Sequence, residues 1–277
     1  MSIARQAIHR SVMPLFRLWH DAVGPTVAKQ TRVCIIGGLY WDARGIRRTP
    51  DVDLFVKYDE DCDRFKIRDL VASRDDCFTA SAESRCGVTY REKVDEAVIT
   101  YDIVDERVTL YEPKGMTLAD VVTQEVLPLP TDTEAIIMKL FSGPDCLKSR
   151  REKAVKDFDD AMKLLNVMGK QDSVVSYGDE AEKAMVKMAF DLFYPKYIEY
   201  KKALPEDSPD AFLWTEEEWK VYLKTSEIGK IVYKDDADKK MVEMAFNAFY
   251  PAFKKAQEDL GKEVMSEEEW KAFLQLD

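Results

Sequence analysis

The sequence has few of the features that mark disulfide-rich, zinc-binding or membrane proteins. Its five cysteines are odd in number and show no CxxC spacing, which argues against a disulfide framework and a structural zinc site. No apolar run approaches the roughly 20 residues that a membrane-spanning helix needs. Glycine and proline number 11 each, and 46% of residues are hydrophobic, so the chain is neither fibrous nor disordered. We therefore expect a cytoplasmic protein that buries a substantial core.

An excess of basic charge is also missing, and the arginines end early. Residues 1–170 contain 26 basic and 28 acidic residues, whereas 171–277 contain 15 and 24, and no arginine follows Arg151. This change in composition predicts a domain boundary near Lys170. The absence of a basic stripe argues against holding a long nucleic-acid duplex. Because guanidinium groups match phosphate geometry, we expect anion chemistry in the N-terminal part.

The first twenty residues contain three arginines and have no acid before Asp21, which is the composition of a mitochondrial presequence. A first helix of the folded domain is the favoured interpretation, because the chain runs into a predicted strand without a spacer. In that helix Leu15, Phe16 and Trp19 would face the core. Mitochondrial import is the alternative.

The next part of the chain alternates strand and helix patterns. Residues 32–36 form an apolar run that ends at Gly37 and Gly38, and residues 51–56 alternate with period two. The pattern further predicts helices over 39–44, 61–72, 131–141 and 150–167, and strands over 77–80, 87–92, 97–104 and 108–111. The predicted fold class is an α/β core with a mixed sheet, followed by an all-helical C-terminal region.

The C-terminal region contains an internal repeat. Residues 179–195 recur 56 positions later as 235–251, and 215–220 recur at an offset of 51 as 266–271. Both copies keep an apolar stripe at helical spacing, which favours core packing over a cofactor site. We therefore expect residues 1–170 to form one domain with trailing helices, and 171–277 to form an acidic helical domain of two repeats, about 176–226 and 232–277. The repeats would serve docking or self-association and carry no catalytic residue.

One constellation points to chemistry. Gly37 and Gly38 are followed, after 12 intervening residues, by Asp51-Val52-Asp53-Leu54. A glycine pair lets the backbone approach a phosphate closely, and two aspartates on one strand face can share divalent cations. Either piece alone is common in proteins, but together they suggest two-metal phosphoryl or nucleotidyl transfer.

The combination at this spacing resembles the signature of the nucleotidyltransferase superfamily, which includes DNA polymerase beta, aminoglycoside nucleotidyltransferases and the AbiEii-type toxins. Residues 47–50, Arg-Arg-Thr-Pro, resemble the segment that precedes the aspartates in AbiEii-like members. The resemblance implies that Asp51 and Asp53 bind two Mg²⁺ or Mn²⁺ ions. Asp102, in an apolar-Asp-apolar triplet, would be the third catalytic and metal-binding carboxylate, with Asp95 in reserve.

The resemblance covers roughly residues 30–167 and also implies contacts to a nucleoside triphosphate such as ATP. The implied nucleotide-binding residues are Gly37, Gly38, Arg47, Thr49, Lys139, Lys156 and Asp157. The alternative for Asp157 and Asp160 is a solvated helix face paired with Lys153, Lys156 and Lys163. Lys139 lies on an apolar helix, and an unpaired ammonium there would be costly to bury.

The predicted activity is transfer of a nucleoside monophosphate from a triphosphate to an acceptor hydroxyl or phosphate. The acceptor stays open among the end of a tRNA or another RNA, a protein and a cationic small molecule. The alternative function is a catalytically silent nucleotide-binding scaffold or sensor of the same fold. No membrane partner is expected.

Overall fold

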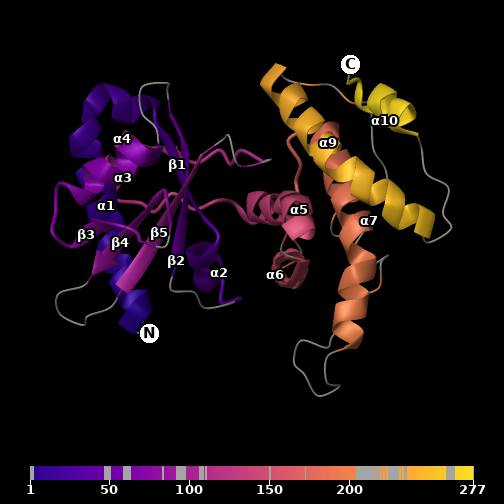
Figure 1. Cartoon of the computed structure of the whole chain (residues 1–277), viewed down its shortest axis with the longest axis horizontal. Coiled ribbons are helices and arrows are strands. Elements are labelled where there is room, and N and C mark those ends of the chain that lie inside the picture. The colour runs from indigo at the N-terminus through magenta and orange to yellow at the C-terminus, as the bar shows by residue number, and fades with distance from the viewer. Residues whose placement is uncertain are drawn as a thin grey trace. The chain divides into compact units, whose positions relative to one another are not determined.

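The computed structural model describes most of the chain and divides it into two compact units, Met1–Thr131 and Asp132–Asp277 (Figure 1). The described residues are 3–46, 51–58, 64–82, 84–91, 98–105, 109, 111–149, 151–171, 173–203, 236–259 and 266–276, with the single residues 215, 219, 221, 223, 231 and 233. The N-terminal unit is a mixed α/β structure, and the C-terminal unit is largely helical. The predicted fold class is confirmed at this level.

A six-stranded sheet organises the N-terminal unit, in the order β3-β4-β5-β2-β1-β6. Its strands are β1 Arg32–Ile36, β2 Asp51–Lys57, β3 Phe78–Ala80, β4 Gly87–Arg91, β5 Val98–Asp105 and β6 Met116–Thr117. The two central strands, β2 and β5, pair in parallel, and the other described pairs are antiparallel. The sheet is therefore mixed, as the sequence predicted.

Three helices cover one face of this sheet, α1 Ile3–Gln30, α3 Arg64–Ala72 and α4 Leu118–Gln124. Phe16 and Trp19 of α1 are fully buried, as predicted, in a core shared with Val52, Leu54 and other apolar residues of the strands. The buried hydroxyl groups of Ser11 and Tyr101 share a hydrogen bond that fixes α1 to β5. Alternation then places Asp51 and Asp53 of β2 and Asp102 of β5 on the other face of the sheet.

The N-terminal prediction was wrong in two details. Thr109 and Tyr111, the described residues of the predicted strand over 108–111, lie outside any strand, and the sheet instead ends at the two-residue β6. Helix α4 was not predicted. It begins after Thr117, whose hydroxyl accepts a hydrogen bond from the Asp120 backbone N–H at 3.0 Å and so caps the helix.

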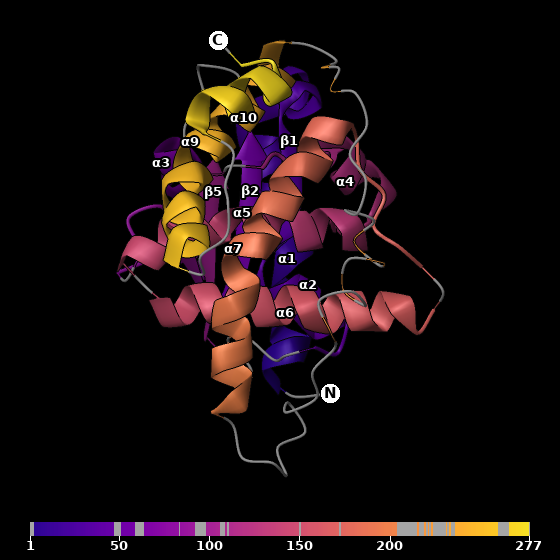
Figure 2. The same cartoon turned by 90° about the vertical axis from the view of Figure 1, so that its right-hand side faces the viewer.

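The C-terminal unit consists of α5 Asp132–Ser149, α6 Arg151–Gly169, α7 Glu180–Lys202, α9 Asp236–Asp259 and α10 Glu267–Leu274. Figure 2 shows α6 crossing α7, and the aromatic ring of Phe158 lies 5.8 Å from those of Phe190 and Phe193. In the same unit Phe141 of α5 meets Phe249 of α9 at 5.5 Å. The trailing helices expected in a 1–170 domain, α5 and α6, thus pack with α7 and α9, and the division falls between Thr131 and Asp132.

The described helices include none that is long and apolar enough to span a membrane.

Candidate functional site

The Gly37 turn between β1 and α2 (Gly38–Ala43) is shaped around an aspartate. Gly37 has a φ of 67°, in the region that favours glycine. Ile36, just before it, is in register with Asp53 of β2. A Cβ at Gly37 would lie 1.8 Å from Oδ2 of Asp53, closer than any real contact. The glycine therefore leaves room for the carboxylate of Asp53, while Gly38 is buried as the first residue of α2.

The parallel pairing of β2 and β5 brings two predicted carboxylates opposite each other. Asp53 is in register with Asp102, and Asp51 is in register with Thr100. Paired residues in neighbouring strands point to the same face, and residues two apart in a strand do so as well. Asp51, Asp53 and Asp102 therefore share one face, opposite the one that α1, α3 and α4 cover.

The three aspartates differ in exposure. Asp51 is exposed, whereas Asp53 and Asp102 are half-buried. Oδ1 of Asp102 is buried and has no hydrogen-bond partner among the described residues, which is unusual because buried polar atoms are nearly always satisfied. An unpartnered carboxylate oxygen is what a site for a hard cation would present.

The donor set fits Mg²⁺ in its chemistry, since Mg²⁺ is commonly held through one or two carboxylates together with substrate phosphates. Asp53 and Asp102 are the facing pair that would hold the ion, with Asp51 two residues away on the same strand face. Within the described residues, however, no three or more His, Cys, Asp or Glu side chains converge closely enough to form a metal site. The protein thus supplies a facing pair rather than a closed three-carboxylate cage.

Several predicted residues lie outside the described part of the chain. These are Arg47 and Thr49, in the segment before β2, and the reserve carboxylate Asp95. Their roles stay predictions.

The remaining predicted nucleotide-binding residues belong to the helical unit. Lys139 of α5 and Asp157 of α6 form an ion pair of 2.5 Å between Nζ and Oδ1, and both side chains are nearly buried. Lys156 is exposed. The alternative of a solvated helix face was wrong for Asp157 and Asp160, which are only 4% and 3% exposed. The ion-pair partner of Asp157 is thus a lysine on the neighbouring helix rather than one on its own helix.

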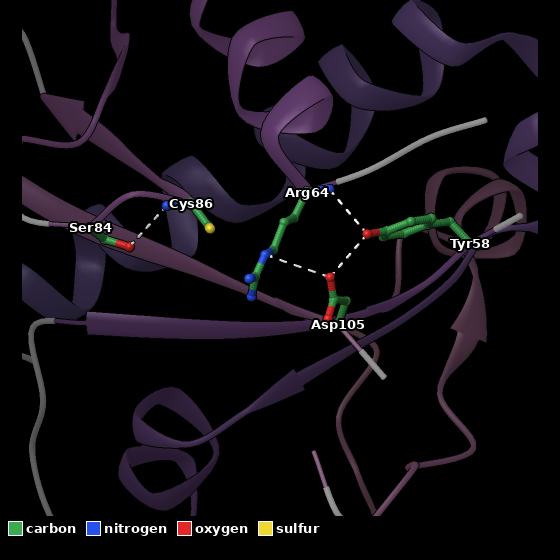
Figure 3. Close-up of polar contacts among 5 residues, drawn as sticks. All are labelled: Tyr58, Arg64, Ser84, Cys86 and Asp105. Carbon is green, nitrogen blue, oxygen red and sulfur yellow. Dashed lines mark hydrogen bonds and ion pairs between the residues drawn. The ribbon is translucent and has the colours of Figure 1, made fainter. Parts of the chain in front are cut away.

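A polar cluster that the sequence did not indicate lies where β2 and β5 end (Figure 3). Asp105, the last residue of β5, is fully buried. It accepts a hydrogen bond of 3.0 Å from the Tyr58 hydroxyl and lies 3.6 Å from Nε of Arg64. The one available signal was that Asp105 occupies an apolar position in the alternation of β5, where an acid needs a partner.

No protein-family model, curated protein or solved structure matches the chain.

Proposed function

We propose that the chain is a Mg²⁺-dependent nucleotidyltransferase. The observation that carries the proposal is the register of Asp53 with Asp102 on neighbouring parallel strands, beside a glycine whose backbone lies against the Asp53 carboxylate. The resemblance to the nucleotidyltransferase signature implies the same glycines and carboxylates. The unpartnered oxygen of Asp102 supports the proposal, because a bound cation would satisfy it.

The reaction joins an acceptor oxygen to the α-phosphorus of a nucleoside triphosphate. The new P–O bond forms as the bond between the α-phosphorus and the oxygen leading to the β-phosphorus breaks, and pyrophosphate leaves. Asp102 would take the proton of the acceptor hydroxyl, and the backbone at Gly37 and Gly38 would let phosphate oxygens approach closely. Mg²⁺ would be held by the facing pair Asp53 and Asp102, with Asp51 beside them, and would offset the charge of the triphosphate and of the leaving group.

The resemblance also implies nucleotide contacts from Lys139, Lys156 and Asp157, which belong to the helical unit, and these roles stay predictions. Within that unit Asp157 fixes the position of the Lys139 ammonium group.

The test is pyrophosphate release from each nucleoside triphosphate in the presence of Mg²⁺ and a cell extract as the acceptor source. Asp51→Asn should abolish release while the circular-dichroism spectrum is unchanged. Asp76→Asn is the matched control, because Asp76 is an exposed aspartate of the same unit outside the sheet. Measurable release that is equal in wild type and Asp51→Asn would rule out the proposed site.

A second candidate is a catalytically silent nucleotide-binding scaffold of the same fold. The lack of a converging group of three ligands among the described residues favours it. Thermal shifts separate the two functions. A nucleotide shift that needs Mg²⁺ and is lost in Asp53→Ala, together with no turnover in wild type, identifies the scaffold.

The acceptor is an RNA end, a protein or a cationic small molecule. Labelled triphosphates incubated with extract and the protein would distinguish these, according to whether the label enters RNA, protein or the small-molecule fraction.

For the helical unit we propose a duplicated docking or self-association module. Two pairs of equivalent contacts support the duplication. The rings of Phe190 and Tyr194 stack at 5.0 Å, and so do those of Phe246 and Tyr250, 56 residues later. The Tyr177 hydroxyl donates to the Leu223 carbonyl, and the Tyr233 hydroxyl donates to the Leu274 carbonyl.

In each proposed repeat the tyrosine hydroxyl therefore binds a backbone carbonyl near the end of the segment that carries the tryptophan. Sedimentation of the full chain tests self-association. A monomer at all concentrations would remove that role and leave docking to another partner.

A further inference from the structure

The Tyr58, Arg64 and Asp105 cluster lies at the carboxyl ends of the two parallel strands (Figure 3). Tyr58 directly follows β2, Asp105 ends β5, and Arg64 begins α3. Ligands of open α/β sheets bind outside the carboxyl ends of parallel strands. The position of the cluster is therefore one where the fold class places binding sites.

The Arg64 backbone N–H and the Tyr58 hydroxyl both find hydrogen-bond partners within the cluster. The backbone N–H of Arg64 donates to the Tyr58 hydroxyl oxygen at 3.2 Å, and that hydroxyl donates to Oδ2 of Asp105. The start of α3 is thus already bound by Tyr58. The group of the cluster whose hydrogen-bonding capacity is still unfilled among the described residues is the Arg64 guanidinium.

The guanidinium of Arg64 is unusually poorly satisfied. Its side chain is only 25% exposed. Among the described residues its ion pair is the 3.6 Å contact between Nε and Oδ2 of Asp105, and the guanidinium carbon lies 5.6 Å from the centre of the Phe65 ring. Nε is buried and has no hydrogen-bond acceptor among the described residues. Arg68, one turn later on α3, differs, because it donates to Oδ1 of Asp69 and to the Arg85 carbonyl, both at 2.7 Å. A largely buried guanidinium without acceptors needs a ligand or water to complete it.

We propose that Arg64 is the centre of a binding site for a phosphate group, either inorganic phosphate or a phosphomonoester. Asp105 holds the guanidinium through its Nε edge, which leaves the terminal Nη pair to face a ligand. In the view of Figure 3 the guanidinium lies between the side chains of Asp105 and Cys86, on the turn that precedes β4. A planar fork of N–H donors matches phosphate oxygens bidentately.

The site is separate from the three aspartates of the proposed reaction. Asp105 is three residues beyond Asp102 on β5 and has the opposite alternation, on the side of the buried core. The inference does not depend on the proposed activity.

The test is titration of the full chain with inorganic phosphate by calorimetry, in EDTA and at ionic strength held constant with KCl. Without divalent ions, the carboxylate face repels phosphate, so binding reports the Arg64 site. Wild type should bind saturably. Arg64→Lys keeps the charge but loses the fork, and should weaken binding at least about tenfold. Arg68→Lys is the matched control and should bind as wild type.

Saturable binding that is equal in wild type and Arg64→Lys would overturn the proposal, and so would the absence of binding in wild type. Glycerol phosphate, titrated in parallel, separates the two sources of the group, since tighter binding than inorganic phosphate identifies a phosphomonoester ligand.

A second measurement needs no variant and covers the case in which Arg64→Lys does not fold. Phenylglyoxal modifies guanidinium groups, and peptide mass spectrometry reports the rate at each arginine. Phosphate should slow modification of Arg64 severalfold more than that of Arg85, which is exposed. Equal slowing at both residues would contradict a site at Arg64.

Discussion

Gly37 and Asp53 pack closely together, because the Asp53 carboxylate occupies the space that a side chain at Gly37 would need. The hypothetical Cβ lies 1.8 Å from Oδ2 and 2.8 Å from Cγ of Asp53. The glycine is therefore a requirement of the carboxylate's position as well as of the turn.

Gly37→Ala should displace the Asp53 side chain and lower the free energy of unfolding. Gly45→Ala is the matched control, since Gly45 also has a positive φ, of 72°, but has open space around its missing Cβ. Both variants place a side chain at a positive φ, but Gly37 also has a ψ of −134°, outside the left-handed helical region, so its backbone strain is larger, about 1–3 kcal/mol. Gly37→Ala adds the clash, about 1–3 kcal/mol, so urea denaturation should find it the more destabilised of the two variants. Equal destabilisation would show that the carboxylate moves aside freely.

Asp102→Asn should separate a metal site from a structural aspartate. Oδ1 of Asp102 has no hydrogen-bond partner to lose in the part of the chain that the structure describes, so without metal the free energy of unfolding of the variant should be within about 1 kcal/mol of wild type. In wild type Mg²⁺ should raise the melting temperature in the presence of a nucleoside triphosphate, because a ligand that binds only the folded state stabilises it. The variant should lose this rise. A full Mg²⁺ effect in Asp102→Asn would exclude Asp102 as a ligand.

Tyr233 should make the helical unit sensitive to high pH. Burial, followed by the nearby Asp179 charge, raises the pKa of Tyr233 from 10.0 to about 12. The folded state therefore holds the phenolic proton more tightly than the unfolded state. This stabilisation is complete below pH 10 and is lost as the pH rises to about 12.

Urea denaturation of wild type and Tyr233→Phe at pH 8, 10 and 11.5 tests this dependence. The variant should be less stable at pH 8 by about 1 kcal/mol, for the lost hydrogen bond to Leu274, and should lose less stability than wild type at pH 11.5. If the free energy of unfolding fell equally with pH in the two proteins, the pH dependence would not come from Tyr233.

Lys139→Met should destabilise the helical unit strongly, by about 3–5 kcal/mol, because it leaves Asp157 charged and nearly buried without its partner. Lys139→Met with Asp157→Leu should recover most of the loss. Lys163→Met is the control. Its partner Asp159 keeps Lys201 at 2.8 Å, so the cost should stay near 1 kcal/mol. If the double variant were no more stable than Lys139→Met, the loss of stability would not come from the unpaired Asp157 alone.

Local patterns predicted the elements around the site but not how they meet. The apolar run of β1 and the alternation of β2 are properties of consecutive residues, so both strands were predicted within a residue. The choice of Asp102 as the third carboxylate came from family resemblance. Its register with Asp53 follows from a parallel pairing that no local pattern encodes.

Longer-range polar partners were the least predictable part. The surface alternative for Asp157 rested on the lysines close to it in the sequence, but its ion-pair partner, Lys139, is on another helix. The Tyr58, Arg64 and Asp105 cluster likewise joins three elements, so the sequence alone did not indicate it. The Thr117 cap of α4 was predictable, since a threonine followed three residues later by an acid is a common helix start.

The parallel pair at the centre of the sheet also governs the order in which the chain can fold. Asp53 and Asp102 are 49 residues apart, and β2 has only β1 as a partner until β5 has been synthesised. Pairing across such a distance is slow, because the loop must close before the contacts form. During synthesis the growing chain therefore carries an unpaired edge of β2 next to its two aspartates, a stage at which their negative charge would repel another copy of the same edge.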